Sequence, residues 1–134
     1  MTSVRVAVIG ANGRMGQTVC RAVEAAADLT LVGRFDVGDD LGDLAGAEVA
    51  VEFAVPDASP SNVAHCVSRG VHTVVGTTGW TQDRLATLRS QVAQRPGLGV
   101  LIAPNFAFGA VLMMAFAEKA ARFYESVEVI ELHH

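Results

Sequence analysis

The amino-acid sequence predicts an α/β fold in which helices cover both faces of a doubly wound parallel sheet, and three observations support this prediction. Short runs rich in β-branched residues alternate with segments of helical length along the 134 residues. Several of these runs are almost entirely apolar, as is typical of parallel strands that are buried on both faces. The first run is followed directly by a glycine-rich turn. Such alternation implies right-handed crossovers between parallel strands.

The first half of the chain contains three predicted strands and one predicted helix. Val4–Ile9 is the first strand, and Arg14–Ala27 is predicted to be helical because its apolar residues recur at helical spacing. Thr30–Phe35 and Glu48–Phe53 are the next two strands, since both are short apolar runs bounded by polar residues and turn formers.

The second half continues the same alternation. Ser59 is expected to cap a helix that has Pro60 at its first position and ends at Gly70. Thr81 is expected to cap the next helix, which stops before Pro96. The other predicted elements are the strands His72–Val75, Val100–Ala103 and Val127–Glu131, and a long helix over Gly109–Tyr124.

The composition suits a compact domain and disfavours several kinds of partner. Hydrophobic residues make up 51% of the chain and the net charge is −4, so binding to nucleic acid or to an anionic membrane is not expected. Cys20 and Cys66 lie far apart, and we expect two reduced, packed thiols and no metal site. Val6–Ile9 is too short for a signal peptide and Phe106–Ala117 is too short to span a bilayer, so a cytoplasmic location is expected.

The glycine-rich turn has the spacing GxxGxxG and joins the first strand to the first helix. Gly10 permits a tight turn, Gly13 allows the backbone to approach a pyrophosphate, and Gly16 allows the helix to pack closely on the sheet. The free N–H groups at the start of the helix attract phosphate. The pattern therefore predicts a Rossmann-type domain that binds NAD(H) or NADP(H), although such a turn alone can also be purely structural.

Asp36 strengthens this interpretation, because it follows the second strand 20 residues after Gly16. An acid at this position accepts hydrogen bonds from the adenosine ribose. It would repel the 2′-phosphate of NADP, which favours NADH. Arg14 leaves NADPH open, since it could donate to that phosphate or could simply be a solvated residue at the helix start.

Three further loops follow predicted strands, and all are expected at the same edge of the sheet. They are Phe53–Pro56, Gly76–Gly79 and Ala103–Phe106. Each consists largely of turn-forming residues and could be an ordinary turn. Ligands of doubly wound sheets bind beyond the carboxyl ends of the strands, so their combination favours a second half of the cofactor site.

Four motifs, taken in order, carry a resemblance to a known family. They are Gly10–Gly16, Val75–Gly79, Ala103–Phe106 and the terminal Val129–His134. Together they closely resemble 4-hydroxy-tetrahydrodipicolinate reductase, also called dihydrodipicolinate reductase, of the diaminopimelate route to lysine. The resemblance covers the whole chain. It implies transfer of hydride from NADH or NADPH to a cyclic dicarboxylate, which yields tetrahydrodipicolinate.

The resemblance also implies roles for individual residues. His133 would be the general acid, and His134 would contact a carboxylate of the substrate. The pyrophosphate would lie on the glycine turn, the adenosine ribose on the acid that follows the second strand, and the nicotinamide between the two later loops. The implied cofactor-binding residues are Gly10, Ala11, Asn12, Gly13, Arg14, Met15, Asp36, Gly76, Thr77, Thr78, Ala103, Pro104, Asn105 and Phe106.

The chain departs from the family pattern in two places. Glu52-Phe53-Ala54 stands where the family usually has Asp-Phe-Thr or Asp-Phe-Ser, so one hydroxyl near the cofactor is missing. The family also continues past the two histidines with a KxDxPSGTA segment and an open sheet that builds a homotetramer. We therefore expect a cofactor-binding domain over residues 1–132, with 133–134 as the start of an absent second domain. Such a chain is expected to have little or no activity alone.

One alternative of another class stays open at this point. The chain could be a stand-alone module that binds NAD(H), or senses redox state, without catalysis. The only lysine, Lys119, lies in the middle of a predicted helix and is a poor substitute for the lysine of the absent segment.

Overall fold

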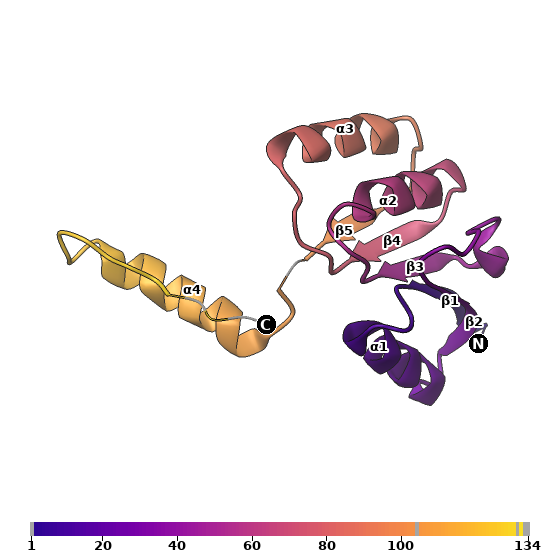
Figure 1. The fold of residues 1–134 in the computed structure, drawn as a ribbon, viewed down its shortest axis with the longest axis horizontal. Coiled ribbons are helices and arrows are strands. Elements are labelled where there is room, and N and C mark those ends of the chain that lie inside the picture. The colour runs from indigo at the N-terminus through magenta and orange to yellow at the C-terminus, as the bar shows by residue number, and fades with distance from the viewer. Residues whose placement is uncertain (1, 104, 131, 133–134) are drawn as a thin grey trace. The chain divides into compact units, whose positions relative to one another are not determined.

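The first part of the chain forms a sheet of five parallel strands in the order β2-β1-β3-β4-β5. The structure is a computed structural model and describes residues 2–103, 105–130 and 132. The strands are β1 (Val4–Ile9), β2 (Leu29–Phe35), β3 (Val49–Glu52), β4 (His72–Val75) and β5 (Val100–Ile102) (Figure 1). The order confirms the predicted doubly wound sheet, because the chain moves outward in opposite directions from β1.

The register of the strands aligns their carboxyl ends. Ile9 pairs with Phe35 on one side and with Glu52 on the other. Glu52 pairs with Val75, which in turn pairs with Ile102. The loops that follow all five strands therefore start at one edge of the sheet, as the predicted site requires.

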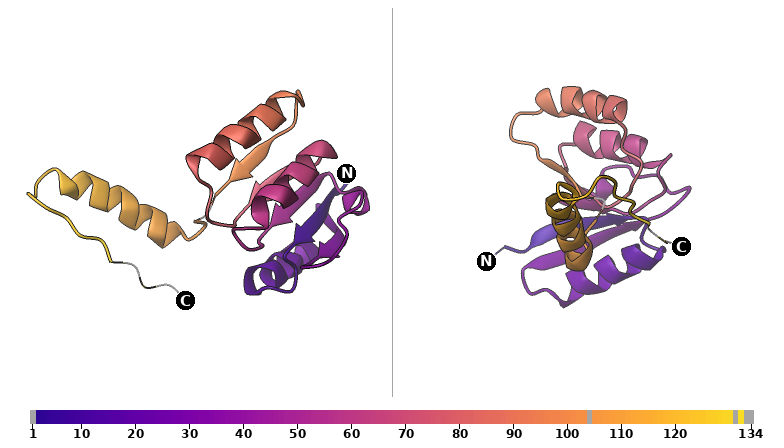
Figure 2. Two further views of the ribbon diagram at one scale, coloured as in Figure 1. Left: turned by 45° about the horizontal axis from the view of Figure 1, so that its top comes forward. Right: turned by 90° about the vertical axis from the view of Figure 1, so that its left-hand side faces the viewer.

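Helices cover both faces of this sheet. Helix α1 (Arg14–Ala25) packs on β1 and β2, whereas α2 (Ser59–Ser68) packs on β3, β4 and α3 (Gln82–Ala93). Figures 1 and 2 show α1 on one side of the sheet and α2 and α3 on the other. The alternating side chains of β1 serve both layers: Val8 packs with Cys20 of α1, and Ile9 packs in the cluster on the opposite face.

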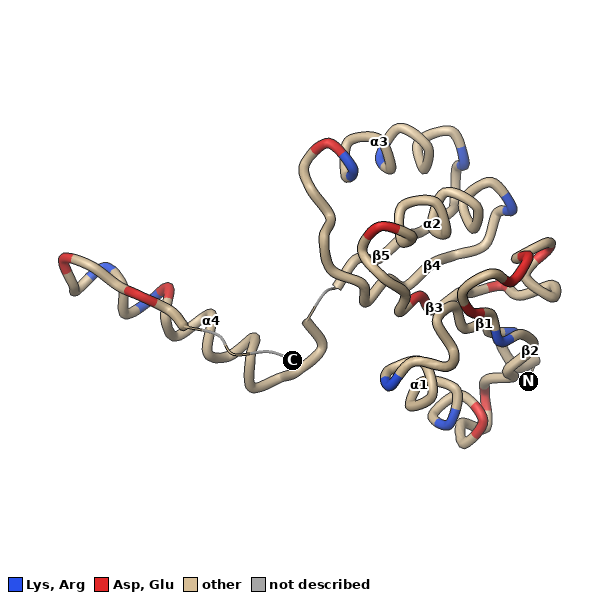
Figure 3. Tube along the Cα trace, in the orientation of Figure 1, with Lys and Arg blue, Asp and Glu red and all other residues tan. Residues whose placement is uncertain are grey.

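Residue contacts divide the chain into two compact units, residues 1–104 and residues 105–134. The second unit contains α4 (Phe108–Ala121), which is largely apolar around its circumference, and none of its side chains is buried. Among the described residues, no helix combines the length and the apolar character needed to cross a membrane. Within the first unit, the arginines are spread over separate elements, whereas several acids lie on the connection after β2 (Figure 3).

Two details of the predicted secondary structure are wrong. Ser59 is the first residue of α2, because the backbone is already helical at Ala58, which occupies the cap position, and the Ser59 hydroxyl donates to the buried carboxylate of Glu52. Residues 127–130 form no strand: a strand needs a partner for its backbone groups, and none of the described residues pairs with them. The predicted cap Thr81 is confirmed, since its Oγ1 accepts the Arg84 N–H at 3.3 Å.

Candidate functional site

A pocket of about 390 Å³ opens where the strand order reverses, between β1 and β3. This is the position at which doubly wound sheets bind ligands. The end of β1, the glycine turn, the connection after β2 and the loop after β3 up to Ala58 form its walls, and α2 contributes Asn62. The lining residues are Ile9, Gly10, Gly13, Asp36, Val37, Gly38, Asp39, Leu41, Phe53, Ala54, Val55, Ala58 and Asn62.

Two of the three glycines in the turn are required by the fold itself. Gly10 has φ +82°, and a Cβ there would overlap the carbonyl of Phe53. A Cβ at Gly16 would overlap the carbonyl of Gly10. Gly13 differs, because it has φ −70° and a Cβ there would meet only the Gly10 carbonyl oxygen, at 3.4 Å. Packing within the chain therefore does not explain a glycine at position 13.

The start of α1 supplies backbone donors to this pocket. Gly13 is the N-cap of the helix and lines the pocket. It has no side chain to accept hydrogen bonds from the first turn, and the first turn carries no acidic residue. The N–H groups and the positive end of the helix dipole are thus available for an anion.

Asp36 is held at the other side of the same pocket by backbone donors. Its Oδ2 accepts the Asn12 N–H at 2.6 Å, and its Oδ1 accepts the Val37 N–H at 2.8 Å. The hydrogen bond from Val37, followed by that from Asn12, lowers the pKa of the Asp36 carboxyl below its usual value. The carboxylate is therefore ionised at neutral pH and fixed against the glycine turn.

The loop after β4 places its two threonines in different environments. Thr77 is 5% exposed, and its hydroxyl donates to Glu52 Oε2 at 2.6 Å while it accepts the Ala54 N–H at 2.9 Å. Thr78 is exposed. At the preceding position, a Cβ on Gly76 would overlap the ring of Phe53. Of the two hydroxyls in the predicted nicotinamide loop, only that of Thr78 is accessible to a ligand.

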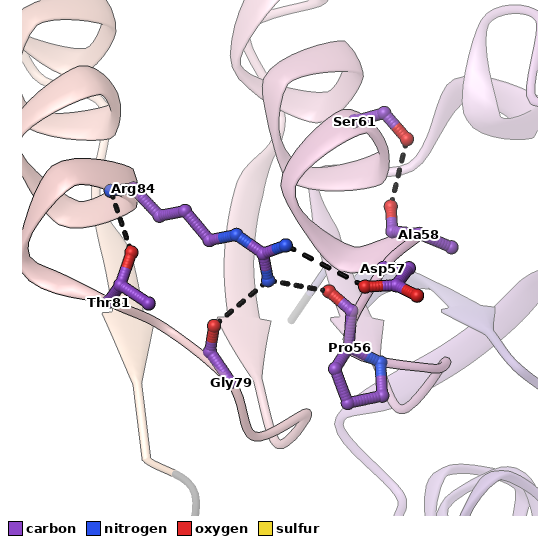
Figure 4. Close-up of polar contacts among 7 residues, drawn as sticks. All are labelled: Pro56, Asp57, Ala58, Ser61, Gly79, Thr81 and Arg84. Atoms are coloured by element: carbon purple, nitrogen blue, oxygen red, sulfur yellow. Dashed lines mark hydrogen bonds and ion pairs between the residues drawn. The ribbon is translucent and has the colours of Figure 1, made fainter.

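Arg84 of α3 joins the loops that follow β3 and β4 (Figure 4). Its Nη1 donates to the Pro56 carbonyl at 3.0 Å and to the Gly79 carbonyl at 2.9 Å. Its Nη2 also lies 3.7 Å from the exposed carboxylate of Asp57. The two carbonyl bonds fix the distance between the loops, whereas an ion pair to so exposed a partner contributes little.

Glu52 is the main feature of the site that the sequence did not predict. It ends β3 and is fully buried. Its Oε2 accepts hydrogen bonds from Ser59 at 2.9 Å and from Thr77, and its Oε1 accepts from Asn62 Nδ2 at 3.4 Å. The signal available in the sequence was a carboxylate at the end of an otherwise apolar strand. Its donors come from positions up to 25 residues away.

The structure brings some of the predicted site residues together and leaves others unplaced relative to them. The residues of the glycine turn, Asp36, Gly76 and Thr77 lie along the carboxyl edge of one sheet, and Ala103 directly follows β5 at that edge. Asn105 and Phe106 belong to the second unit. Pro104, His133 and His134 lie outside the described residues. Pocket residues that the sequence reasoning missed include Gly38, Asp39, Leu41 and Asn62.

The sheet order, the glycine turn at its switch point and the acid at the end of β2 define a domain of the Rossmann class. Residues 4–106 match the family model described as dihydrodipicolinate reductase, N-terminus. The chain therefore belongs to the dihydrodipicolinate reductase family, which confirms the resemblance carried by its motifs.

Curated relatives named 4-hydroxy-tetrahydrodipicolinate reductase are similar over the whole chain. The protein of Streptomyces avermitilis is 57% identical over 136 residues, which cover 100% of this chain and 54% of the relative. That of Cutibacterium acnes is 55% identical over 131 residues, which cover 98% of this chain and 53% of the relative. The chain thus spans about half the length of the curated relatives it matches.

Solved structures show the same architecture. The dipicolinate-bound dihydrodipicolinate reductase from Paenisporosarcina sp. TG-14 matches with a TM-score of 0.75 and 27% identity, over 92% of this chain and 55% of that chain. A myo-inositol 2-dehydrogenase from Lactobacillus plantarum matches with a TM-score of 0.66 and 12% identity, over 89% of this chain and 42% of that chain. The second likeness shows a shared fold alone.

Proposed function

We propose that this chain is the cofactor-binding part of an enzyme that reduces 4-hydroxy-tetrahydrodipicolinate, with loss of water, to tetrahydrodipicolinate with NADH or NADPH, in the diaminopimelate route to lysine. Membership of the family supports the reaction. The observation that carries the cofactor is the pocket at the switch point, with the uncapped start of α1 and the fixed carboxylate of Asp36 in its walls.

The residues of the pocket fit a dinucleotide. Gly13 has no internal reason to be glycine, yet it borders the pocket at the helix start, where a pyrophosphate would need the close approach of the backbone. Apolar side chains of Val37, Leu41 and Val55 line the same pocket and suit a flat aromatic base. When bound, the reduced nicotinamide supplies the hydride.

Each predicted residue has a role in this proposal. The turn from Gly10 to Met15 holds the pyrophosphate, and Asp36 accepts hydrogen bonds from the adenosine ribose. The loop Gly76–Thr78 and the segment Ala103–Phe106 surround the nicotinamide. His133 delivers the proton that accompanies hydride transfer, since an imidazole titrates near neutrality, and His134 contacts a substrate carboxylate.

The finer part of the proposal is a preference for NADH. The Asp36 carboxylate is ionised and held beside the ribose position, where it would repel a 2′-phosphate. The next residue is Val37, which offers no compensating charge. Arg14 is the cation within the glycine turn, and it is exposed.

Calorimetric titration of the chain with NADH, and separately with NADPH, tests the proposal. We expect both to bind, with NADH the tighter ligand. Absence of binding to either, from a sample shown to be folded by circular dichroism, would overturn it. The inactivity of the isolated cofactor-binding part is tested separately, by adding freshly generated substrate to the chain and NADH and following the loss of NADH absorbance. We expect little or no turnover, and robust turnover would overturn that expectation.

A further inference from the structure

We propose that Glu52 is a positioning residue. It acts through Thr77 to hold the proposed nicotinamide loop, Gly76–Gly79, at a fixed position relative to the pocket that receives the rest of the dinucleotide. This inference rests on the proposed function. It concerns a carboxylate that is fully buried and is not itself among the residues that line the cofactor pocket.

The first step of the argument is the cost of burying this side chain. A carboxylate without exposure to water is destabilising unless hydrogen bonds satisfy its oxygens. Here three side chains converge on it: Ser59 and Thr77 donate to Oε2, and Asn62 donates to Oε1. The carboxylate is therefore the centre of a network that joins β3, α2 and the loop after β4.

The second step is what each partner carries. Asn62 lines the pocket, so one arm of the network reaches the wall of the proposed adenosine end. Thr77 belongs to the proposed nicotinamide loop. Its hydroxyl donates to Glu52 and also accepts the Ala54 N–H, so the network extends to the loop after β3. Ala54 also lines the pocket. These hydrogen bonds thus connect the proposed adenosine end and the proposed nicotinamide end of the site through the buried carboxylate of Glu52.

The third step is the direction of the Thr77 hydroxyl. Because it is nearly buried and both of its bonds are made inside the protein, it orients the loop and leaves ligand contact to the loop backbone and to Thr78. Loss of this hydroxyl should therefore affect the nicotinamide end of a bound dinucleotide, while the pyrophosphate and adenosine end stays unchanged.

A comparison of two ligands tests this. NADH reaches both ends of the site, whereas ADP-ribose lacks the nicotinamide ring, so the ratio of their dissociation constants isolates the loop. Thr77→Val keeps the shape and removes the hydroxyl. We expect it to weaken NADH binding about tenfold and to leave ADP-ribose binding within about twofold. Thr77→Ser restores the hydroxyl and should restore the ratio.

Leu88→Ala is the matched control, because Leu88 is buried in the core and belongs neither to the Glu52 network nor to the pocket lining. It should lower the melting temperature and leave the ratio of the two dissociation constants at its wild-type value. A general loss of stability would move both ligands together, so this control separates positioning from structure.

Glu52→Gln links the effect to the carboxylate and remains informative if Thr77→Val does not fold. Alone it should weaken NADH binding about threefold with little effect on ADP-ribose, because the neutral amide is a weaker acceptor. In the Thr77→Val background it should add nothing. Equal ratios in wild type, Thr77→Val and Glu52→Gln would overturn the inference, whereas failure of wild type to bind either ligand would overturn the proposed function instead.

Discussion

Asp36 and Gly13 both line the pocket at the switch point, and the proposed function gives them opposite roles. Asp36 would supply a fixed charge, whereas Gly13 would leave room for a ligand to approach the backbone. The N–H groups of Asn12 and Val37 hold the carboxylate of Asp36 in place without a ligand. Ligand binding would therefore cost little additional side-chain entropy at this residue. Gly13 leaves the helix start open. These two residues can be tested separately because neither is needed to fill the core.

Asp36→Ala should weaken NADH binding about tenfold, because the variant loses a charged acceptor for the ribose hydroxyls. NADPH binding should change less, since the same substitution removes a repulsion. The ratio of the two dissociation constants, measured by calorimetry, reports this. Asp28→Asn is the control, as it makes the same change of charge at an exposed residue outside the pocket. An equal effect of Asp36→Ala on both cofactors would contradict the assigned role.

Gly13→Ala separates binding from folding. The added methyl group has room within the chain, so the free energy of unfolding should change by less than about 1 kcal/mol. Cofactor affinity should nevertheless fall about tenfold or more, because the methyl group occupies the space of a phosphate. Gly16→Ala should instead lower the free energy of unfolding by about 3 kcal/mol, since the added Cβ would overlap the Gly10 carbonyl. Urea denaturation beside calorimetry distinguishes the two variants.

At the scale of the elements, two separate sets of hydrogen bonds connect the loops after β3 and β4. Glu52 and Thr77 connect them from within, and Arg84 connects them from α3 through two backbone carbonyls. Backbone carbonyls are acceptors that sequence cannot point to, because every residue carries one. The connection therefore became visible only once the loops were placed.

Arg84→Gln should lower the free energy of unfolding by about 1–2 kcal/mol, because charge-assisted bonds to two carbonyls are lost. Amide hydrogen exchange in the loop Gly76–Gly79 should accelerate at the same time. Arg89→Gln is the control on the same helix, since Arg89 takes no part in these bonds. If loop exchange is unchanged in Arg84→Gln, the two carbonyl bonds do not hold the loop.

Much of the first unit could be predicted because its signals are local. The apolar runs place all five strands of the sheet to within one or two residues, and the hydroxyl of Thr81 marks the start of α3. The predictions fail where a partner distant in sequence decides. Ser59 lies inside α2, where its hydroxyl donates to Glu52, and residues 127–130 pair with no strand among the described residues.

At the scale of the whole molecule, the core contains an ionisable group that the cofactor site does not use. Cys66 lies on α2 and is fully buried. Burial, opposed by a hydrogen bond with Thr73 and reinforced by the nearby Glu52 carboxylate, raises the pKa of the Cys66 thiol to about 11. The folded protein thus keeps this thiol protonated at pH values where the unfolded chain would ionise it.

Above the pKa of an unfolded thiol, the contribution of Cys66 to the free energy of unfolding should therefore fall as pH rises. The contribution of Cys66 is fully present below the pKa of an unfolded thiol and is lost as pH approaches the folded pKa of about 11. Over that interval the loss should be about 2–3 kcal/mol. Urea denaturation across the pH range measures it, and Cys66→Ala should lack this part of the slope. Parallel curves for wild type and variant would contradict the raised pKa.

The strand order β2-β1-β3-β4-β5 also bears on how the chain emerges from a ribosome. If the strands pair in the order of synthesis, β1 and β2 pair first, and β3, β4 and β5 then each join a free edge of the sheet already made. No later strand has to insert between two that are already paired. The glycine turn and Asp36 meet as soon as this first pair forms, since Asn12 and Asp36 hydrogen bond directly. Synthesis in chain order would thus bring the glycine turn and Asp36 together before the residues of the loop Gly76–Gly79 exist.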